Sequence, residues 1–88
     1  MITFNRENYR HYRLMVQAKC SGADVHFVNG ELGKVLNGCV NYEGFVKHNL
    51  NTAEYREGIK DGVIHALIEL KKRTGVFEEF EYFFEEVA

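Results

Sequence analysis

Residues 28–38 read Val-Asn-Gly-Glu-Leu-Gly-Lys-Val-Leu-Asn-Gly and contain two Asn-Gly pairs, Asn29-Gly30 and Asn37-Gly38. Asn and Gly readily adopt the positive φ angles of a two-residue β-hairpin turn, so Asn-Gly between β-prone residues is the strongest short-range signal for a hairpin. The two pairs are separated by only a few residues. The stretch therefore predicts short strands that are neighbours in an antiparallel meander.

The flanking residues extend this predicted sheet. Residues 12–20 alternate, with Leu14, Val16, Ala18 and Cys20 on one side, which is typical of a strand with one buried face. Residues 25–28, 31–36 and 39–48 supply the other strands, with Gly44 as a bulge or bend. The alternative for the first segment is a helix over residues 6–20 that Asn5 caps. We favour the strand.

A long helix is predicted from about residue 52 to about residue 74. Asn51 or Thr52 can cap its start, with Glu54 completing a capping box, and Gly75 is well placed to end it. Its apolar residues recur at helical spacing: they are Tyr55, Ile59, Val63, Ala66, Leu67 and Leu70.

The remaining residues predict a second, shorter helix. Phe77, Phe80, Phe84 and Val87 form a helical stripe, which indicates an amphipathic C-terminal helix over about residues 76–87. A chain of 88 residues fits a single domain. The expected fold is thus α+β: a three- or four-stranded antiparallel meander sheet packed on one long helix, with the short C-terminal helix alongside.

Charge is unevenly distributed along the chain, whose net charge is −2. Residues 1–20 carry four basic side chains against Glu7, whereas residues 76–88 carry five glutamates and no basic residue. No secretory leader and no apolar stretch long enough for a bilayer is evident, so we expect a cytoplasmic protein without a membrane partner. Cys20 and Cys39 are expected as small buried hydrophobes, although a cross-strand disulfide between them stays geometrically open.

Motifs for catalysis or cofactor binding are not evident in the chain. It lacks a nucleophile elbow, a phosphate-binding loop and a paired Cys/His signature. Its four histidines and two cysteines do not have the spacing of a zinc site. We therefore predict a non-enzymatic protein that holds no cofactor and no metal.

The acidic, aromatic C-terminal stretch is the leading candidate for function. Carboxylates along a helix can occupy a basic, nucleic-acid-binding groove of another protein, where charge complementarity speeds association and selects the partner. The predicted partner-binding residues are Glu78, Glu79, Glu81, Tyr82, Phe83, Glu85 and Glu86, with Tyr82 or Phe83 as an anchor. The alternative is an ordinary amphipathic helix with a solvated face.

Two further surfaces are candidates. The N-terminal segment interleaves basic and aromatic residues, which suits phosphate contact and base stacking, a protein interface, or a solvated edge: its residues are Arg6, Tyr9, Arg10, Tyr12, Arg13 and Lys19. Gly58 and Gly62 lie one turn apart in the long helix, beside Ile64 and Ile68. They indicate either a close approach of another backbone, as in a homodimer, or close packing within the domain.

The predicted layout of strands followed by one long helix is similar to small antitoxin domains with a β-β-β-α core. In size and charge it also resembles small phage-encoded inhibitors of bacterial defence nucleases, the anti-CRISPR class of viral protein. This resemblance implies an inhibitor of a nucleic-acid-handling complex. A small nucleic-acid-binding domain that uses the basic N-terminal segment is the alternative.

Overall fold

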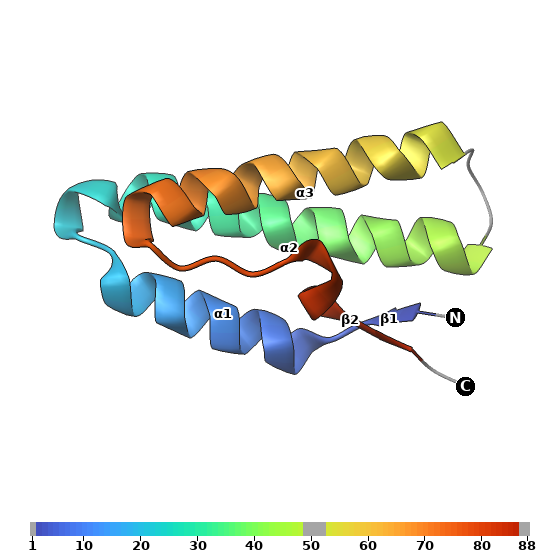
Figure 1. The fold of residues 1–88 in the computed structure, drawn as a ribbon, viewed down its shortest axis with the longest axis horizontal. Helices are drawn as coiled ribbons and strands as arrows, with labels where there is room; N and C mark the ends of the chain where they lie inside the picture. Colours follow the sequence, from blue (N-terminus) through green and yellow to red (C-terminus); the bar gives the residue numbers. More distant parts are fainter. Residues whose placement is uncertain (1, 49–52, 87–88) are drawn as a thin grey trace.

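The computed structural model describes residues 2–48 and 53–86. Its elements in chain order are β1 (Ile2–Phe4), α1 (Arg6–Lys19), the 3-10 turn η1 (Gly22–Asp24), α2 (Val25–His48), α3 (Ala53–Thr74), the 3-10 turn η2 (Phe80–Phe83) and β2 (Phe84–Glu86). Helices α2 and α3 run antiparallel as a long hairpin, and α1 lies along one side of it (Figure 1). The C-terminal segment returns beside α1 and brings β2 to β1 (Figure 1).

The predicted meander sheet is wrong. Within the described residues the only sheet is the β1–β2 pair, and both Asn-Gly pairs lie inside α2, as does Gly44. Four apolar residues of α2 are buried at intervals of four, three and four residues: they are Val28, Leu32, Val35 and Cys39. The resemblance to a β-β-β-α core is therefore also wrong, because it depended on the predicted sheet.

Burial explains why α2 is a helix in spite of its glycines. Each fully buried aliphatic side chain contributes about 1.5–3 kcal/mol, whereas a glycine inside a helix costs about 1 kcal/mol relative to alanine. A single continuous apolar face on α2 therefore outweighs the local turn preference of the two Asn-Gly pairs. The sequence spacing that carries this face is close to a heptad repeat.

The predicted strand over residues 12–20 is also wrong, and the alternative helix is confirmed. The Asn5 side chain caps α1, because its Oδ1 accepts a hydrogen bond from the Asn8 backbone N–H at 3.0 Å. Helix α1 buries Tyr9, Tyr12 and Val16, which lie three and four residues apart. Leu14, which the strand would have buried, is 49% exposed.

The long helix is confirmed as α3, and its predicted end at Gly75 is correct. Gly75 has a φ of +77°, the left-handed conformation that glycine adopts without strain, and its N–H donates to the Lys71 carbonyl at 2.8 Å. The cap predicted at Asn51 or Thr52 lies outside the described residues.

The predicted helix over residues 76–87 is wrong. Residues 76–79 form no regular element, and η2 and β2 follow. The 3-10 turn brings Phe80 and Phe83, which are three residues apart, into the core together. Strand β2 then pairs antiparallel with β1, with Phe4 opposite Phe84. Val87, the last residue of the predicted stripe, lies outside the described residues.

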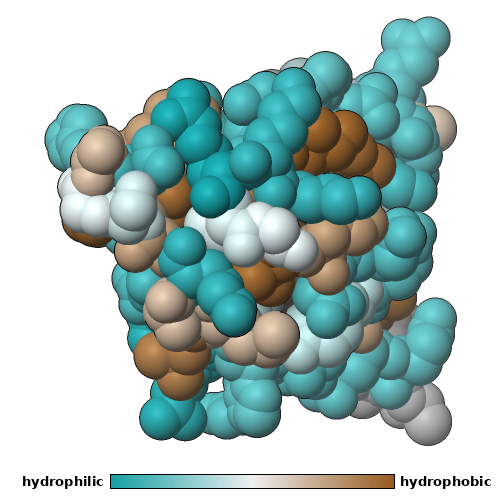
Figure 2. Space-filling model, turned by 60° about the vertical axis from the view of Figure 1, so that its left-hand side comes forward, coloured by the Kyte–Doolittle hydropathy of each residue, from teal (hydrophilic) through white to brown (hydrophobic). Residues whose placement is uncertain are grey.

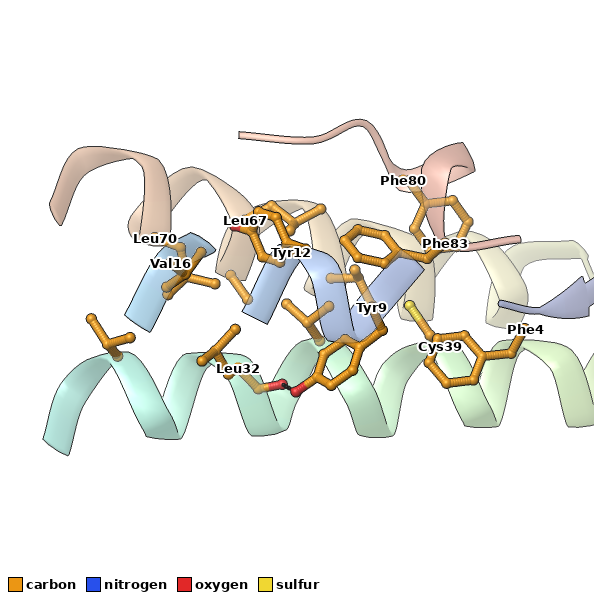
Figure 3. Close-up of a cluster of buried hydrophobic side chains, with 14 residues drawn as sticks. Phe4, Tyr9, Tyr12, Val16, Leu32, Cys39, Leu67, Leu70, Phe80 and Phe83 are labelled. Atoms are coloured by element: carbon orange, nitrogen blue, oxygen red, sulfur yellow. Dashed lines mark hydrogen bonds between the residues drawn. The ribbon is translucent and has the colours of Figure 1, made fainter. Parts of the chain in front are cut away.

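The core lies between α1, the α2–α3 hairpin and η2 (Figure 3). Tyr12 and Phe83 are its largest fully buried side chains, and their rings meet edge to face at 5.4 Å. The Tyr9 hydroxyl donates to the Leu32 carbonyl at 3.1 Å, which satisfies the buried phenol (Figure 3). Cysteines 20 and 39 are both free. Burial raises the pKa of the Cys39 thiol to about 12.

Helices α2 and α3 approach each other closely at Gly38. A Cβ at that position would overlap Val63 Cγ2 of α3, so any larger residue there forces Val63 or the helices to shift. Across residues 2–48 and 53–86, none of the helices is sufficiently long and apolar to cross a membrane.

Candidate protein-interaction surface

The C-terminal segment is fixed to α1 and β1 by hydrogen bonds. The Asn5 backbone N–H donates to the Phe83 carbonyl at 2.8 Å, and Asn8 Nδ2 donates to the Tyr82 carbonyl at 2.8 Å. The Tyr12 hydroxyl reaches the Val76 carbonyl at 3.5 Å. Side chains on residues 76–86 are therefore presented on a backbone that the fold holds in place.

The predicted acidic residues divide into exposed and inward-facing members. Glu79, Glu81, Glu85 and Glu86 are exposed, and we call these four the acidic surface. Glu78 is half-buried. Burial raises the pKa of the Tyr12 phenol above its ordinary value, and the Glu78 carboxylate raises it further.

The two predicted anchors are placed differently from the sequence expectation. Phe83 is fully buried in the core and is not presented to a partner. Tyr82 is half-buried and packs against Phe83 with ring centroids 5.4 Å apart. The aromatic residues next to the acidic surface are instead those of a pocket that sequence reasoning did not find.

This pocket, which we call the aromatic pocket, has a volume of about 340 Å³. Its walls come from both strands, η2, α2 and α3: they are Ile2, Tyr42, Lys60, Phe80, Glu81, Phe84, Glu85 and Glu86. Three members of the acidic surface stand at this pocket. The exposed carboxylates and an aromatic wall therefore occur together at one place on the molecule.

Three rings make the aromatic wall. Tyr42 of α2 lies 5.0 Å from Phe80 and 5.5 Å from Phe84, and those two rings are 4.9 Å apart. Lys60 of α3 points at the same place: its Nζ lies 5.6 Å from the centre of the Phe80 ring and 3.7 Å from Glu81 Oε1. A cation is thus held between a ring and a carboxylate.

The basic N-terminal segment does not form a stacking surface. Tyr9 and Tyr12 are buried, so their rings face the core. Arg6 lies over the Phe4 ring at 5.4 Å, Arg10 pairs with Glu7 at 3.6 Å, and both are exposed. Arg13 is half-buried and Lys19 is exposed.

The glycine pair of α3 is not packed against the rest of the domain. A Cβ at Gly58 or Gly62 would meet no atom within 4 Å, so close packing within the domain does not explain these two glycines. Both line a shallow hollow of about 360 Å³ between α2 and α3. Ile64 packs against the core, and Ile68 is 39% exposed. The predicted self-association at these residues stays a prediction.

Other exposed apolar side chains are scattered. They are Leu14, Met15, Val25, Val40, Tyr55 and Phe77. The η1 end of the molecule shows separate hydrophobic areas among hydrophilic atoms (Figure 2). Over the described ranges, 2–48 and 53–86, no three His, Cys, Asp or Glu side chains are grouped as metal ligands would be.

Comparison of the chain with known protein families, with curated proteins and with solved structures found no match.

Proposed function

We propose that this chain is a small, non-enzymatic protein-binding module that captures a basic partner through the acidic surface. The observation that carries the proposal is the meeting of exposed carboxylates with the aromatic pocket on a backbone fixed by hydrogen bonds. Aromatic side chains supply contact area at an interface, and the carboxylates supply charge complementarity.

The charge balance at the pocket sets the sign of the partner. Two exposed carboxylates of the pocket, those of Glu81 and Glu85, face one ammonium group, that of Lys60. The excess negative charge favours a basic surface and repels an acidic one. A protein with a nucleic-acid-binding groove presents such a surface, and a small acidic protein bound there would inhibit it. We therefore keep the role that the sequence predicted, an inhibitor of a nucleic-acid-handling complex.

Charge reversal tests the proposal. The triple variant Glu79→Lys/Glu81→Lys/Glu85→Lys should lose capture of basic proteins from the lysate of the native cell, with and without nuclease treatment, while its far-UV circular dichroism spectrum stays native. A matched triple variant at Glu7, Glu54 and Glu57, which are exposed on α1 and α3, makes the same change in net charge and should keep capture. Equal capture by both variants and the wild type would refute the proposal.

The nucleic-acid-binding alternative has less support from the structure. Base stacking needs exposed rings, and Tyr9 and Tyr12 are buried. Binding through Arg6, Arg10 and Lys19 alone would be a phosphate interaction that falls steeply with salt. Titration of labelled single- and double-stranded DNA and RNA at about 50 mM salt, where phosphate contacts are strong, decides this alternative.

A further inference from the structure

We infer that the aromatic pocket receives one cationic side chain of a basic protein segment, arginine in preference to lysine, and that Lys60 is the resident cation that this side chain displaces. The inference rests on the proposed function, because it names what the basic partner inserts at the acidic surface. Three features of the pocket support it: the rings, the carboxylates and the position of Lys60.

The ring wall suits a flat, weakly hydrated cation. Tyr42, Phe80 and Phe84 form one continuous cluster, with centroid separations between 4.9 and 5.5 Å. A cation over the face of such a ring is attracted by its quadrupole. A guanidinium group both stacks on rings and bonds to carboxylates through several N–H donors, whereas an ammonium group is a compact and strongly hydrated charge. This difference favours arginine.

The carboxylates complete the site for a cation. Glu81, Glu85 and Glu86 stand on the rim, and Glu85 and Glu86 both belong to β2. Strand β2 is pinned to β1 with Glu85 opposite Thr3 and Glu86 opposite Ile2, so the carboxylates are held near the rings in the free protein. A cationic side chain that enters between them meets rings on one side and negative charge on the other.

Lys60 places a cation at this site in the free protein. Its ammonium group lies at 5.6 Å from the Phe80 ring centre and 3.7 Å from Glu81. Its side chain is 29% exposed and that of Glu81 is 72% exposed, so water screens the pair and the interaction is weak. A long, flexible lysine stem can swing its ammonium group back to water. An incoming cation therefore competes with Lys60 and displaces it.

Competition has a measurable signature. When a site is open in only a fraction of the molecules, the apparent affinity for the ligand equals the intrinsic affinity multiplied by that fraction. Lys60→Met should therefore bind an arginine-containing peptide about two- to fivefold more tightly, because an exposed ion pair is worth at most about that factor. Lys72→Met makes the same change in net charge. Lys72 pairs with Glu69 elsewhere on α3 and does not line the pocket, so its loss should change the affinity less than about twofold.

The experiment is a titration of isotope-labelled full-length chain, followed by amide chemical shifts. The probes are three capped heptapeptides of glycine and serine that differ only at the central residue, which is arginine, lysine or the neutral arginine isostere citrulline. Binding should follow the order arginine, lysine, citrulline, and the largest shifts should fall on residues of the aromatic pocket. Phe84→Leu, which removes one half-buried ring and keeps an apolar side chain, should weaken arginine-peptide binding about fivefold or more, since it takes away a stacking partner.

The outcomes separate this inference from the proposed function. Equal shifts with arginine and citrulline peptides, or weaker binding by Lys60→Met, would overturn the inference. If the triple charge reversal abolishes capture of the partner while Lys60→Met and Phe84→Leu leave capture unchanged, the acidic surface is the interface and the pocket is not the recognition site. If the arginine peptide fills the pocket but the triple reversal keeps capture, the proposed function fails instead.

Discussion

Gly38→Ala should destabilise the fold relative to other glycine-to-alanine changes in the same hairpin. The new Cβ would overlap Val63 Cγ2, and Val63 is only 1% exposed and belongs to the hydrophobic core. Valine is also stiff at χ1, which makes a rotamer change expensive. Overpacking of this kind costs about 1–3 kcal/mol.

A matched variant removes the contribution of helix propensity. Gly62→Ala on α3 gains the same propensity, about 1 kcal/mol, but its Cβ meets no atom within 4 Å. The free energy of unfolding of Gly38→Ala should therefore lie below that of Gly62→Ala by about 1–3 kcal/mol, the full overpacking term. For a chain of this size each 1 kcal/mol corresponds to a shift in Tm of about 4–8 °C.

The assay is urea unfolding followed by circular dichroism, at protein concentrations low enough to keep the chain in one oligomeric state. The double variant Gly38→Ala/Val63→Ala should be more stable than the sum of the two single changes predicts, because the smaller side chain makes room for the Cβ. Equal stability of Gly38→Ala and Gly62→Ala would refute the close approach of α2 and α3 at this position.

Three other perturbations test single features of the fold. Asn5→Ala removes the cap of α1 and should lower the free energy of unfolding by about 1 kcal/mol. Asn5→Asp keeps a capping oxygen and should retain most of the stability of the wild type. Urea unfolding of both variants checks this. Burial raises the pKa of the Cys39 thiol from its ordinary value near 9 to about 12, so the folded state keeps the proton that the unfolded state loses. Stability should therefore fall as pH rises from about 9 to about 12. Cys39→Ala should reduce the slope of that part of a pH series of Tm values, and the remaining slope comes from the Tyr9 and Tyr12 phenols, whose pKa values burial also raises. Arg73→Ala removes the contact with Asp24 at 2.8 Å and the stacking on the Phe27 ring at 4.1 Å, and should lower Tm by an amount that corresponds to about 1 kcal/mol. A Tm equal to that of Lys72→Ala would show that these two contacts of Arg73 contribute no stability.

Helix α3 could be predicted because its signals agree with each other. Its apolar residues, the basic last turn and the glycine that follows all indicate one helix, and Gly75 takes the conformation that the helix end requires. In α2 the signals conflict. Asn-Gly pairs favour turns, whereas the spacing of Val28, Leu32, Val35 and Cys39 favours a helix. The buried face decides, since the burial of these four side chains exceeds the summed local preferences.

The candidate site could be predicted only in part. The run of glutamates is a local property of the sequence, and it marks the right segment. The pocket beside it is assembled from Tyr42, Lys60 and Phe84, which lie on three elements far apart along the chain. Pairing of β1 with β2 joins two three-residue strands from opposite ends of the described chain, and no local pattern announces such a contact. Burial of Phe83 likewise depends on residues far away along the chain, since its ring packs against Tyr9 and Tyr12 of α1.

Pairing of Ile2 with Glu86 encloses nearly the whole chain in a single loop. Closing a loop of that length costs the unfolded chain about 4 kcal/mol of entropy by the logarithmic relation, and the two strands that close it are only three residues long. We therefore expect the pairing of β1 with β2 to open by itself, as a local unfolding unit, more often than the α2–α3 hairpin does. A partner bound at the aromatic pocket would keep the two strands paired. Its presence should then be detected as slower amide hydrogen exchange at Thr3, at the opposite end of the chain from the acidic surface.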